Sequence, residues 1–424
     1  MLPALANRNF RLFLAGQFVS LIGSLMQSVA IGWLVLDLTD SPLTVGVVQG
    51  LGAAPILLLG LVGGVWADRL DRRAALLVFQ ALFMLEAAFL TGLTATGHAT
   101  VGWVAAAAIF GGVVSAVEIP TRQSFVHDIV GEVHLVQAVA LTSTAFNLAR
   151  VLGPALGGVL IAAAGFTWCF ALNTLSFVAV LWALSRVRVA PGGAGREHPG
   201  VADALREGVA FLGDSPAARA IVVLSGVLTV FGFQFVTMLP VLARDVLHLQ
   251  SSGYGGLVAS VGVGAATGAL SLGVRRSSGG PRLVPLSGVA FGLLLAAASF
   301  APTPAAAMLG FTAVGMSMAG NGIASNSWLQ RLAPDALRGR VLGFYAFAVL
   351  GLAPVGALLF GWAAEQFGAR HALALGGGVC AVVSLGVLWG GVLGGRPAAP
   401  PARAGAGGAA GRGAQAKSSP PAFP

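Results

Sequence analysis

Two ionisable residues in this chain lie inside long apolar stretches. Glu86 lies midway along residues 74–95, and Arg150 lies within residues 136–163. A carboxyl group in an apolar medium can take up and release a proton, and a charge at that depth is costly unless it has a role. Both residues are therefore candidates for proton coupling. A structural carboxyl bonded to a neighbouring helix, or an arginine that reaches the membrane surface, would give the same pattern.

Uncharged polar residues recur at helical spacing in other apolar stretches. Residues three, four or seven positions apart lie on one face of a helix, so these residues could line a polar path. Such a lining suits an amphipathic or mostly apolar small molecule that meets few charges. The candidate path residues are Gln17, Ser20, Ser24 and Gln27 in the first stretch, Asn147 in the fifth, Thr229 and Phe233 in the seventh, and Ser317, Asn321 and Trp328 in the tenth.

The elements that must position these residues are membrane-spanning helices. Of the 424 residues, 56% are hydrophobic and only 9% are charged. A helix needs ~20 mainly apolar residues to cross the hydrocarbon core of a bilayer. Stretches of that kind recur along the chain, and we predict an all-α membrane protein with twelve transmembrane helices. The predicted spans are residues 12–36, 45–66, 74–95, 101–117, 136–163, 166–184, 218–242, 253–274, 283–300, 304–325, 341–363 and 371–393.

Lys and Arg residues concentrate in alternate loops. If both termini are cytoplasmic, nearly all of the 24 Lys and Arg residues face the cytoplasm, and the exceptions are Arg150, Arg244 and Arg370. This asymmetry follows the positive-inside rule and predicts a multi-pass protein of the cytoplasmic (inner) membrane. The net charge of +9 is spread over loops with no aromatic and basic stripe, so we expect lipid contact and no nucleic-acid partner.

One long polar stretch divides the predicted spans six and six. We predict an N-terminal six-helix bundle at 1–184, a cytoplasmic linker with an amphipathic helix at 185–217, a C-terminal six-helix bundle at 218–393 and a disordered cytoplasmic tail at 394–424. The two halves echo each other weakly in sequence, which predicts two pseudo-symmetric bundles. Duplicated units with a binding site near the midplane are typical of secondary transporters.

A cluster of charges in the sequence GGVWADRLDRR follows the second predicted span. Together with the first span and the entry to the eleventh span, it makes the chain resemble the major facilitator superfamily. Within that superfamily, the chain is similar to the group of twelve-span exporters that includes enterobactin (siderophore) and multidrug exporters. The signature between spans two and three of this superfamily is met by Gly64, Asp68, Arg69, Arg72 and Arg73, with Asp71 where a glycine is usual.

The resemblance implies a gate on the cytoplasmic side. Asp68 is expected at the positive N-terminal end of span eleven, near Gly339 and Arg340, with Arg122 as a possible partner and Glu118 in the same network. These contacts would hold the cytoplasmic side closed and would break when the protein opens inward. The alternative is that the charges only orient the loop.

The fifth predicted span has a face of small residues for close helix packing. Gly153, Pro154, Gly157 and Gly158 resemble the span-five motif of exporters, with Ala149 in place of its first glycine. This motif favours export over uptake. Span four, however, lacks the arginine that many proton antiporters of the superfamily carry there, so the coupling site is not fixed by the resemblance.

Taken together, these features predict a secondary active transporter that exports an amphipathic small molecule, a siderophore or a drug-like compound, by alternating access with proton antiport. No dinucleotide, phosphate-loop or HExxH motif occurs in a suitable context. We therefore expect no enzyme activity, no cofactor and no metal site. The expected partners are the small-molecule substrate, protons and the lipid bilayer, with the chain working as a monomer. An uptake carrier, or a non-transporting receptor or scaffold with the same fold, is the alternative.

Overall fold

The computed structural model describes residues 3–188, 201–274, 281–334, 337–391 and 393, and every regular element in these ranges is helical. The prediction of an all-α fold is confirmed. The elements up to the middle of the chain are α1 (Pro3–Ala6), α2 (Arg8–Thr39), α3 (Pro42–Arg69), α4 (Arg72–Ala95), α5 (Val101–Ala164), α6 (Phe166–Arg186) and α7 (Val201–Asp214). The later elements are α8 (Pro216–Phe231), η1 (Phe233–Met238), α9 (Leu239–Val241), η2 (Leu242–Val246), α10 (Ser251–Val274), α11 (Leu283–Ser299), α12 (Pro304–Leu332), α13 (Arg338–Ala346), η3 (Phe347–Gly351), α14 (Ala353–Phe367) and α15 (Ala369–Trp389).

Ten helical segments of the described chain are long and apolar enough to cross a membrane. One of them, α5, is 64 residues long and bends at Gly131, whose φ of 67° and ψ of 176° interrupt the helix. The shorter apolar helix α11 has 17 residues. With α5 counted as two spans and α11 as one, these segments match the twelve predicted spans.

The helix of the fourth predicted span extends beyond that span. Residues 118–130, which lie between the fourth and fifth predicted spans, continue the helix of α5. Phe125 in this stretch packs edge-on against Phe13 of α2, with ring centroids 5.5 Å apart. The polar residues therefore belong to a helix that extends beyond the apolar span and packs on its neighbours.

Turn chemistry fixes the starts of several helices. Ser41 precedes Pro42 and accepts a hydrogen bond from the backbone N–H of Thr44 at the start of α3. Ser215 caps α8 in the same way, also followed by a proline. A serine cap satisfies a free N–H of the first turn, and a proline at the first helical position loses no hydrogen bond.

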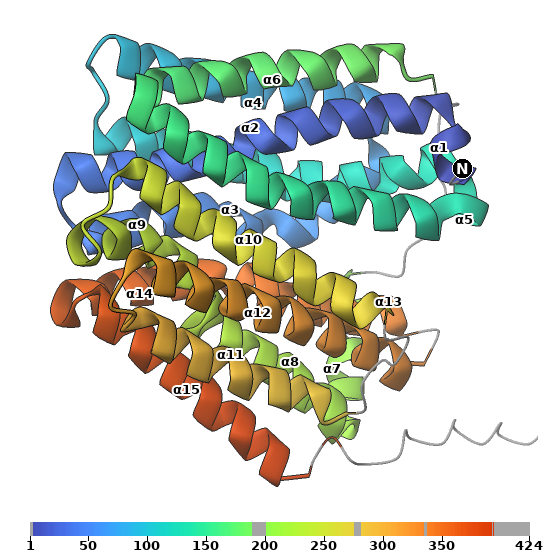
Figure 1. Cartoon of the computed structure of the whole chain (residues 1–424). Helices are drawn as coiled ribbons and strands as arrows, with labels where there is room; N and C mark the ends of the chain where they lie inside the picture. Colours follow the sequence, from blue (N-terminus) through green and yellow to red (C-terminus); the bar gives the residue numbers. More distant parts are fainter. Residues whose placement is uncertain (1–2, 189–200, 275–280, 335–336, 392, 394–424) are drawn as a thin grey trace, which may run out of the picture.

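The helices form two groups that contact each other most closely near one end of the molecule. In Figure 1, α2 to α6 lie side by side, α8 to α15 form the other group, and α7 follows the connection between them. The groups meet where α10 packs on α5 and α14 packs on α3. From the end that carries α9 and η2, the ribbons of α12 and α15 run away from α2 toward the end that carries the N-terminus and α13. We refer to these as the Arg244 end and the terminus end.

Glycines allow the two groups to meet backbone against backbone. A Cβ atom added at Gly158 of α5 would lie 2.5 Å from the carbonyl oxygen of Ser251 and 2.8 Å from the Cα of Gly255 in α10. A Cβ added at Gly46 of α3 would lie 2.8 Å from the Cα of Gly361 in α14. All three distances are too short for a real Cβ atom, so only glycine permits these two crossings.

Candidate functional site

A polar cavity of about 450 Å³ lies within the first group of helices. We call it the N-terminal cavity, because its lining comes from α2, α3, α4, α5 and α6. It includes the first four predicted path residues, Gln17, Ser20, Ser24 and Gln27, together with Glu86, Gln49, Gln80, Ser115, Glu118, Arg122 and Asn173. The polar stripe predicted on the first span therefore faces a cavity.

Glu86 is held in this cavity by a chain of neutral side chains. Its Oε1 accepts a hydrogen bond from Nε2 of Gln27 at 3.1 Å. The Gln27 oxygen accepts from Nδ2 of Asn173 at 2.8 Å, and the Asn173 oxygen accepts from the hydroxyl of Ser176 at 3.0 Å. A Cβ added at Gly111 would lie 3.3 Å from the other carboxyl oxygen of Glu86. An amide, rather than a cation, therefore binds this carboxyl group.

The second carboxyl group of the cavity has a cation beside it. Glu118 Oε1 accepts from Nε of Arg122 at 2.9 Å, one helical turn away, and from Nε2 of Gln80 at 3.2 Å. The Glu118 side chain is only 6% exposed. Sequence analysis placed Arg122 as a possible partner of Asp68, whereas the described ion pair joins it to Glu118. The cavity thus contains one compensated carboxylate and one carboxyl with a neutral partner.

A second cavity, of about 220 Å³, lies between the two groups of helices. This interface cavity is lined by Leu25, Ser28, Val29, Gln49, Arg150 and Pro154 from the first group, and by Gln234, Val236, Thr237, Tyr254, Val258, Val261 and Gly262 from the second. Arg150 and Glu86, each predicted as a proton-coupling residue, line different cavities. Ser28 and Gln49 line both cavities and stand between them.

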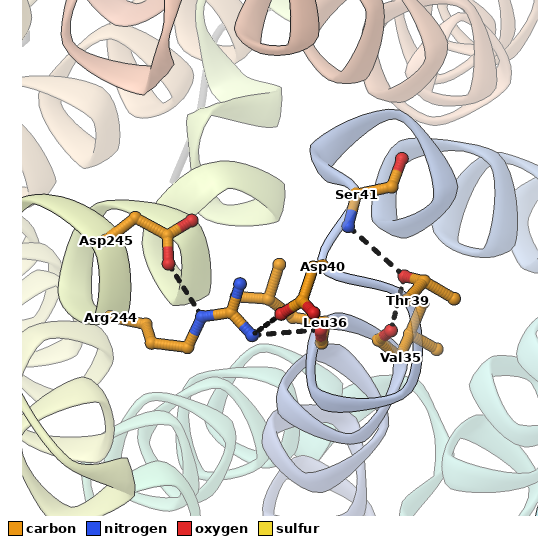
Figure 2. A network of polar contacts seen from close by, with 7 residues as sticks. All are labelled: Val35, Leu36, Thr39, Asp40, Ser41, Arg244 and Asp245. Carbon is orange, nitrogen blue, oxygen red and sulfur yellow. Dashed lines mark hydrogen bonds and ion pairs between the residues drawn. The ribbon is translucent and has the colours of Figure 1, made fainter.

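An arginine network joins the two groups at the Arg244 end (Figure 2). Arg244 of η2 forms an ion pair with Asp40 at 2.9 Å and donates to the carbonyl oxygen of Leu36 at 3.0 Å. Its Nε also donates to Asp245 at 2.6 Å. Asp40 caps α2 in the left-handed conformation, with a φ of 51°. A cation at the C-terminal end of a helix is stabilised by the helix dipole, so this network holds η2 against the end of α2.

A second polar contact bridges the groups at the same end. Glu365 of α14 accepts hydrogen bonds from the hydroxyl of Ser41 at 3.1 Å and from the backbone N–H of Leu43 at 3.2 Å. A carboxylate at the first turn of α3 satisfies a free N–H and lies at the positive end of the helix. Sequence analysis missed both contacts.

Two arginines of the predicted gate contact the first group of helices. Arg72 forms an ion pair with Asp128 of α5 at 2.6 Å. Arg73 donates to the carbonyl oxygens of Leu184 and Ser185 at 3.0 and 2.8 Å, where α6 ends. These contacts stabilise the loop between α3 and α4 within its own group.

The remaining gate residues are only partly described. Arg340 of α13 forms an ion pair with Glu207 of α7, and an added Cβ at Gly339 would meet no described heavy atom within 4 Å. The side chains at Gly64, Asp68 and Arg69 lie outside the described part of the structure. The predicted contact between Asp68 and span eleven thus stays a prediction.

The model of a family of transmembrane secretion effectors matches residues 1–392. The chain belongs to this family of the major facilitator superfamily. It is 27% identical to the staphyloferrin A transporter of Staphylococcus aureus (strain NCTC 8325 / PS 47) over 362 residues, which cover 84% of this chain and 89% of that protein. It is 29% identical to the enterobactin exporter EntS of Shigella boydii serotype 18 over 384 residues, which cover 89% and 90%.

Solved structures of similar fold agree with this family assignment. A D-xylose-proton symporter superposes with a TM-score of 0.70 at 14% identity, over 91% of this chain and 97% of that one. A bacterial homologue of the human lysosomal transporter Spinster gives a TM-score of 0.67 at 12% identity, over 91% and 95%. At such low identity, the likeness shows the major facilitator fold alone.

Six predicted path residues line neither cavity: Asn147, Thr229, Phe233, Ser317, Asn321 and Trp328. Asn321 is 1% exposed and donates to the carbonyl oxygen of Val284 at 2.9 Å. Phe233 packs edge-on against Phe291, with centroids 5.2 Å apart. Asn147 and Ser317 bond to carbonyls one turn earlier on their own helices. These four side chains are engaged in or between helices in the described conformation, whereas the hydroxyl of Thr229 and the indole N–H of Trp328 are buried without a described hydrogen-bond partner.

The glycines of the fifth predicted span make two different contacts. Added Cβ atoms at Gly153 and Gly157 would lie 2.8 Å from the Cβ of Leu25 and 3.0 Å from the Cγ of Met26, both in α2. Gly158 faces the second group instead, and Pro154 lines the interface cavity. One short motif thus packs α5 on its own group and on the other group.

Several polar lining residues were not singled out from the sequence. They are Gln49, Gln80, Ser115 and Asn173 in the N-terminal cavity, and Gln234, Thr237 and Tyr254 in the interface cavity. The sequence did contain a signal for the Gln and Asn residues, because an amide side chain in an otherwise apolar span needs a hydrogen-bond partner. For the Arg244 network, the signal was a basic residue in a loop on the side where such residues are rare.

Proposed function

We propose that this chain is a secondary active transporter that exports a siderophore-like, amphipathic small molecule in exchange for protons. The observation that carries the proposal is Glu86, a carboxyl group that faces a polar cavity inside the membrane and is bound by the neutral amide of Gln27. Without a cation to hold it charged, such a group can gain and lose a proton during a transport cycle.

The two groups of helices provide the moving parts. We propose that they correspond to bundles at 1–184 and 218–393, joined by the linker 185–217, and that they rock about the interface cavity. The described contacts of Arg244 and Glu365 keep the Arg244 end closed in this conformation. In the opposite conformation, the contacts of Asp68, Arg69 and their predicted partners would close the terminus end. The tail 394–424 lies outside the described residues.

The distribution of basic residues supports a cytoplasmic terminus end. Helix boundaries place Arg244 and Arg370 at the Arg244 end. The terminus end carries Arg8, Arg11, Arg72, Arg73, Arg186, Arg188, Arg206, Arg219, Arg282, Arg331, Arg338 and Arg340. By the positive-inside rule, both termini face the cytoplasm. The closed end then faces outward, and the chain is in an inward-facing conformation.

The substrate class rests on the named relatives. One relative is a staphyloferrin A transporter and others are enterobactin exporters, and both names refer to siderophores. Ser28 and Gln49, which line both cavities, supply hydrogen-bonding groups for a ligand of mixed polarity. We propose that one chain completes the cycle as a monomer.

Vesicles of known orientation test this proposal. Inside-out membrane vesicles containing the chain are given an inward-directed substrate gradient of enterobactin or staphyloferrin A, with and without an acidic interior. We expect accumulation that requires the pH gradient and is lost with a protonophore. Vesicles carrying an unrelated membrane protein are the control.

Each other result points to a different function. Accumulation only in right-side-out vesicles would indicate uptake. Accumulation that is unchanged by the protonophore would contradict proton coupling. No movement of either siderophore, or of a lipophilic dye, by protein shown to be folded in the membrane would favour a receptor or scaffold.

A further inference from the structure

The interface cavity has a positive charge without an acidic partner. Arg150 is its one ionisable side chain apart from Tyr254, and none of the described residues that line it is Asp or Glu. The other polar lining groups are Ser28, Gln49, Gln234 and Thr237, whose hydroxyls and amides can donate hydrogen bonds. A guanidinium at membrane depth is costly when nothing neutralises it, so this cavity favours an anion.

The surroundings of Arg150 leave its N–H groups available to a ligand. The described contact of its guanidinium is with the ring of Phe146, one turn earlier on α5, at 5.8 Å from the ring centroid. Hydrogen bonds and ion pairs in the described part of the chain include none from this guanidinium. The N–H donors of the planar guanidinium fit a carboxylate, or paired catecholate oxygens, better than the compact ammonium group of a lysine does.

One wall of the cavity is made of irregular backbone. Helix α8 ends at Phe231, and Gly232 (φ −136°, ψ −67°) leads into the 3₁₀ segment η1, which contributes Gln234 and Thr237 to the lining. A Cβ at Gly232 would lie 2.5 Å from the ring of Phe291, so a larger residue does not fit there. Irregular backbone at membrane depth occurs where it is buried in protein or lines a cavity, and broken helices form binding sites in transporters.

We propose that the interface cavity binds the anionic oxygen groups of the exported molecule and that Arg150 recognises them. The inference rests on the proposed export function and deepens it, because it names the chemical class: small molecules that carry carboxylate or catecholate groups. Lipophilic cations are disfavoured by the same charge. The walls come from both groups of helices, so the site is complete only in conformations that bring α5 and α10 together.

Equilibrium binding to the purified full chain in lipid nanodiscs tests this assignment. The probes are staphyloferrin A, enterobactin and, as a lipophilic cation, rhodamine 6G. We expect Arg150→Gln to weaken binding of both siderophores roughly 10- to 100-fold, the range for loss of a charged hydrogen bond. Arg150→Lys restores part of the affinity, and rhodamine binding does not fall. Arg282→Gln, which removes the same charge at an exposed position, is the matched control.

A second pair of variants tests the location. Val258 lines the cavity from α10, whereas Val263 on the same helix is 41% exposed. Val258→Trp fills the cavity, and we expect it to abolish siderophore binding. Val263→Trp adds the same side chain outside the cavity and leaves binding unchanged.

The outcomes separate this inference from the proposed function. Unchanged siderophore affinity in Arg150→Gln, or an equal loss for siderophores and rhodamine, overturns the anion site. Failure of the wild type to bind either siderophore also overturns it. Proton-driven export of rhodamine by the same protein would then leave a proton-coupled exporter of another substrate. Siderophore binding that depends on Arg150, without any transport, would support the site and contradict the transport function.

Discussion

The N-terminal cavity and the interface cavity differ in their walls and in their charge. The first is lined by residues of α2 to α6 and contains Glu86 and the Glu118–Arg122 pair. The second is shared by both groups of helices and contains Arg150. A cavity within one group keeps its walls when the groups move apart, whereas a shared cavity changes with every movement. The proposed proton site and the proposed ligand site therefore lie in separate cavities of one fold.

The largest expected effect comes from removing the carboxyl group of Glu86, which tests whether the two cavities differ in function. Glu86→Gln keeps the shape of the side chain and removes its titration, so we expect it to abolish stimulation of transport by the pH gradient. Siderophore affinity in nanodiscs is expected to stay unchanged, because the interface cavity is intact. Vesicle transport and equilibrium binding measure the two effects.

The control for this change is Glu132→Gln, which alters an exposed carboxylate beside the bend of α5. A pH response in Glu86→Gln equal to that of the wild type would move the proton site elsewhere. Loss of siderophore binding in the same variant would mean that the two cavities are not separate in function.

A larger side chain placed between the two groups of helices is expected to affect the interface cavity and to leave the N-terminal cavity unchanged. In Gly158→Leu, the new side chain collides with Ser251 and Gly255 of α10. Such overpacking costs about 1–3 kcal/mol and reduces the fraction of molecules in which α5 and α10 are packed together. We therefore expect siderophore affinity and transport to fall roughly 10- to 100-fold. Binding isotherms and vesicle transport measure this loss. Gly102→Leu, at a position with open space on the same helix, is expected to behave as the wild type, and equal losses in both variants would contradict the prediction.

The amide chain of the first cavity offers a smaller test. Gln27→Leu leaves Glu86 and Asn173 without their described partner, and an unpaired buried polar group costs about 1–3 kcal/mol. We expect a melting temperature lower by a few degrees, roughly the shift that such a loss produces in a large domain, and slower proton-driven transport. Gln330→Leu, at an exposed amide, is the control. A melting curve identical to that of the wild type would argue against the chain of bonds.

The Arg244 network should give the smallest effect. Asp40 is 84% exposed, and exposed ion pairs contribute little, so Asp40→Asn is expected to raise opening of this end only about 2- to 5-fold. Arg244→Gln is expected to do slightly more, because it also loses the Leu36 carbonyl. Opening can be measured as labelling of Ser28→Cys by a membrane-impermeant thiol reagent, since Cys169 and Cys380 are buried. Asp37→Asn, an exposed acid on the same helix, is the control, and labelling rates equal to that control would contradict the role of the network.

The sequence predicts the helices well because apolar length and cap residues are local properties. The Ser41–Pro42 and Ser215–Pro216 pairs mark helix starts within a few residues of the predicted spans. The span prediction does not show that residues 118–130 are helical, because a helix that extends beyond the apolar span has the polar composition of a loop. Its helical state depends on packing, such as that of Phe125 on Phe13.

The site was predictable only where one helix defines it. The stripe Gln17, Ser24 and Gln27 has the periodicity of a single face, and that face lines a cavity. Which face of a helix borders a cavity otherwise depends on its neighbours: Asn321 has the same kind of pattern, yet it bonds to α11. The bond from Arg244 to Leu36 joins residues 208 positions apart, and no local pattern contains that pairing.

The glycine crossings also have an entropic consequence. Where Gly46 meets Gly361 and Gly158 meets Gly255, the surfaces in contact are backbone, and glycine has no side-chain rotamers to lose. Forming and separating these contacts therefore orders and releases almost no side chains. The cost of each closure is small at these points, and the open and closed arrangements can lie close in free energy. A protein that must pass repeatedly between two shapes benefits from surfaces that gain and lose so little order.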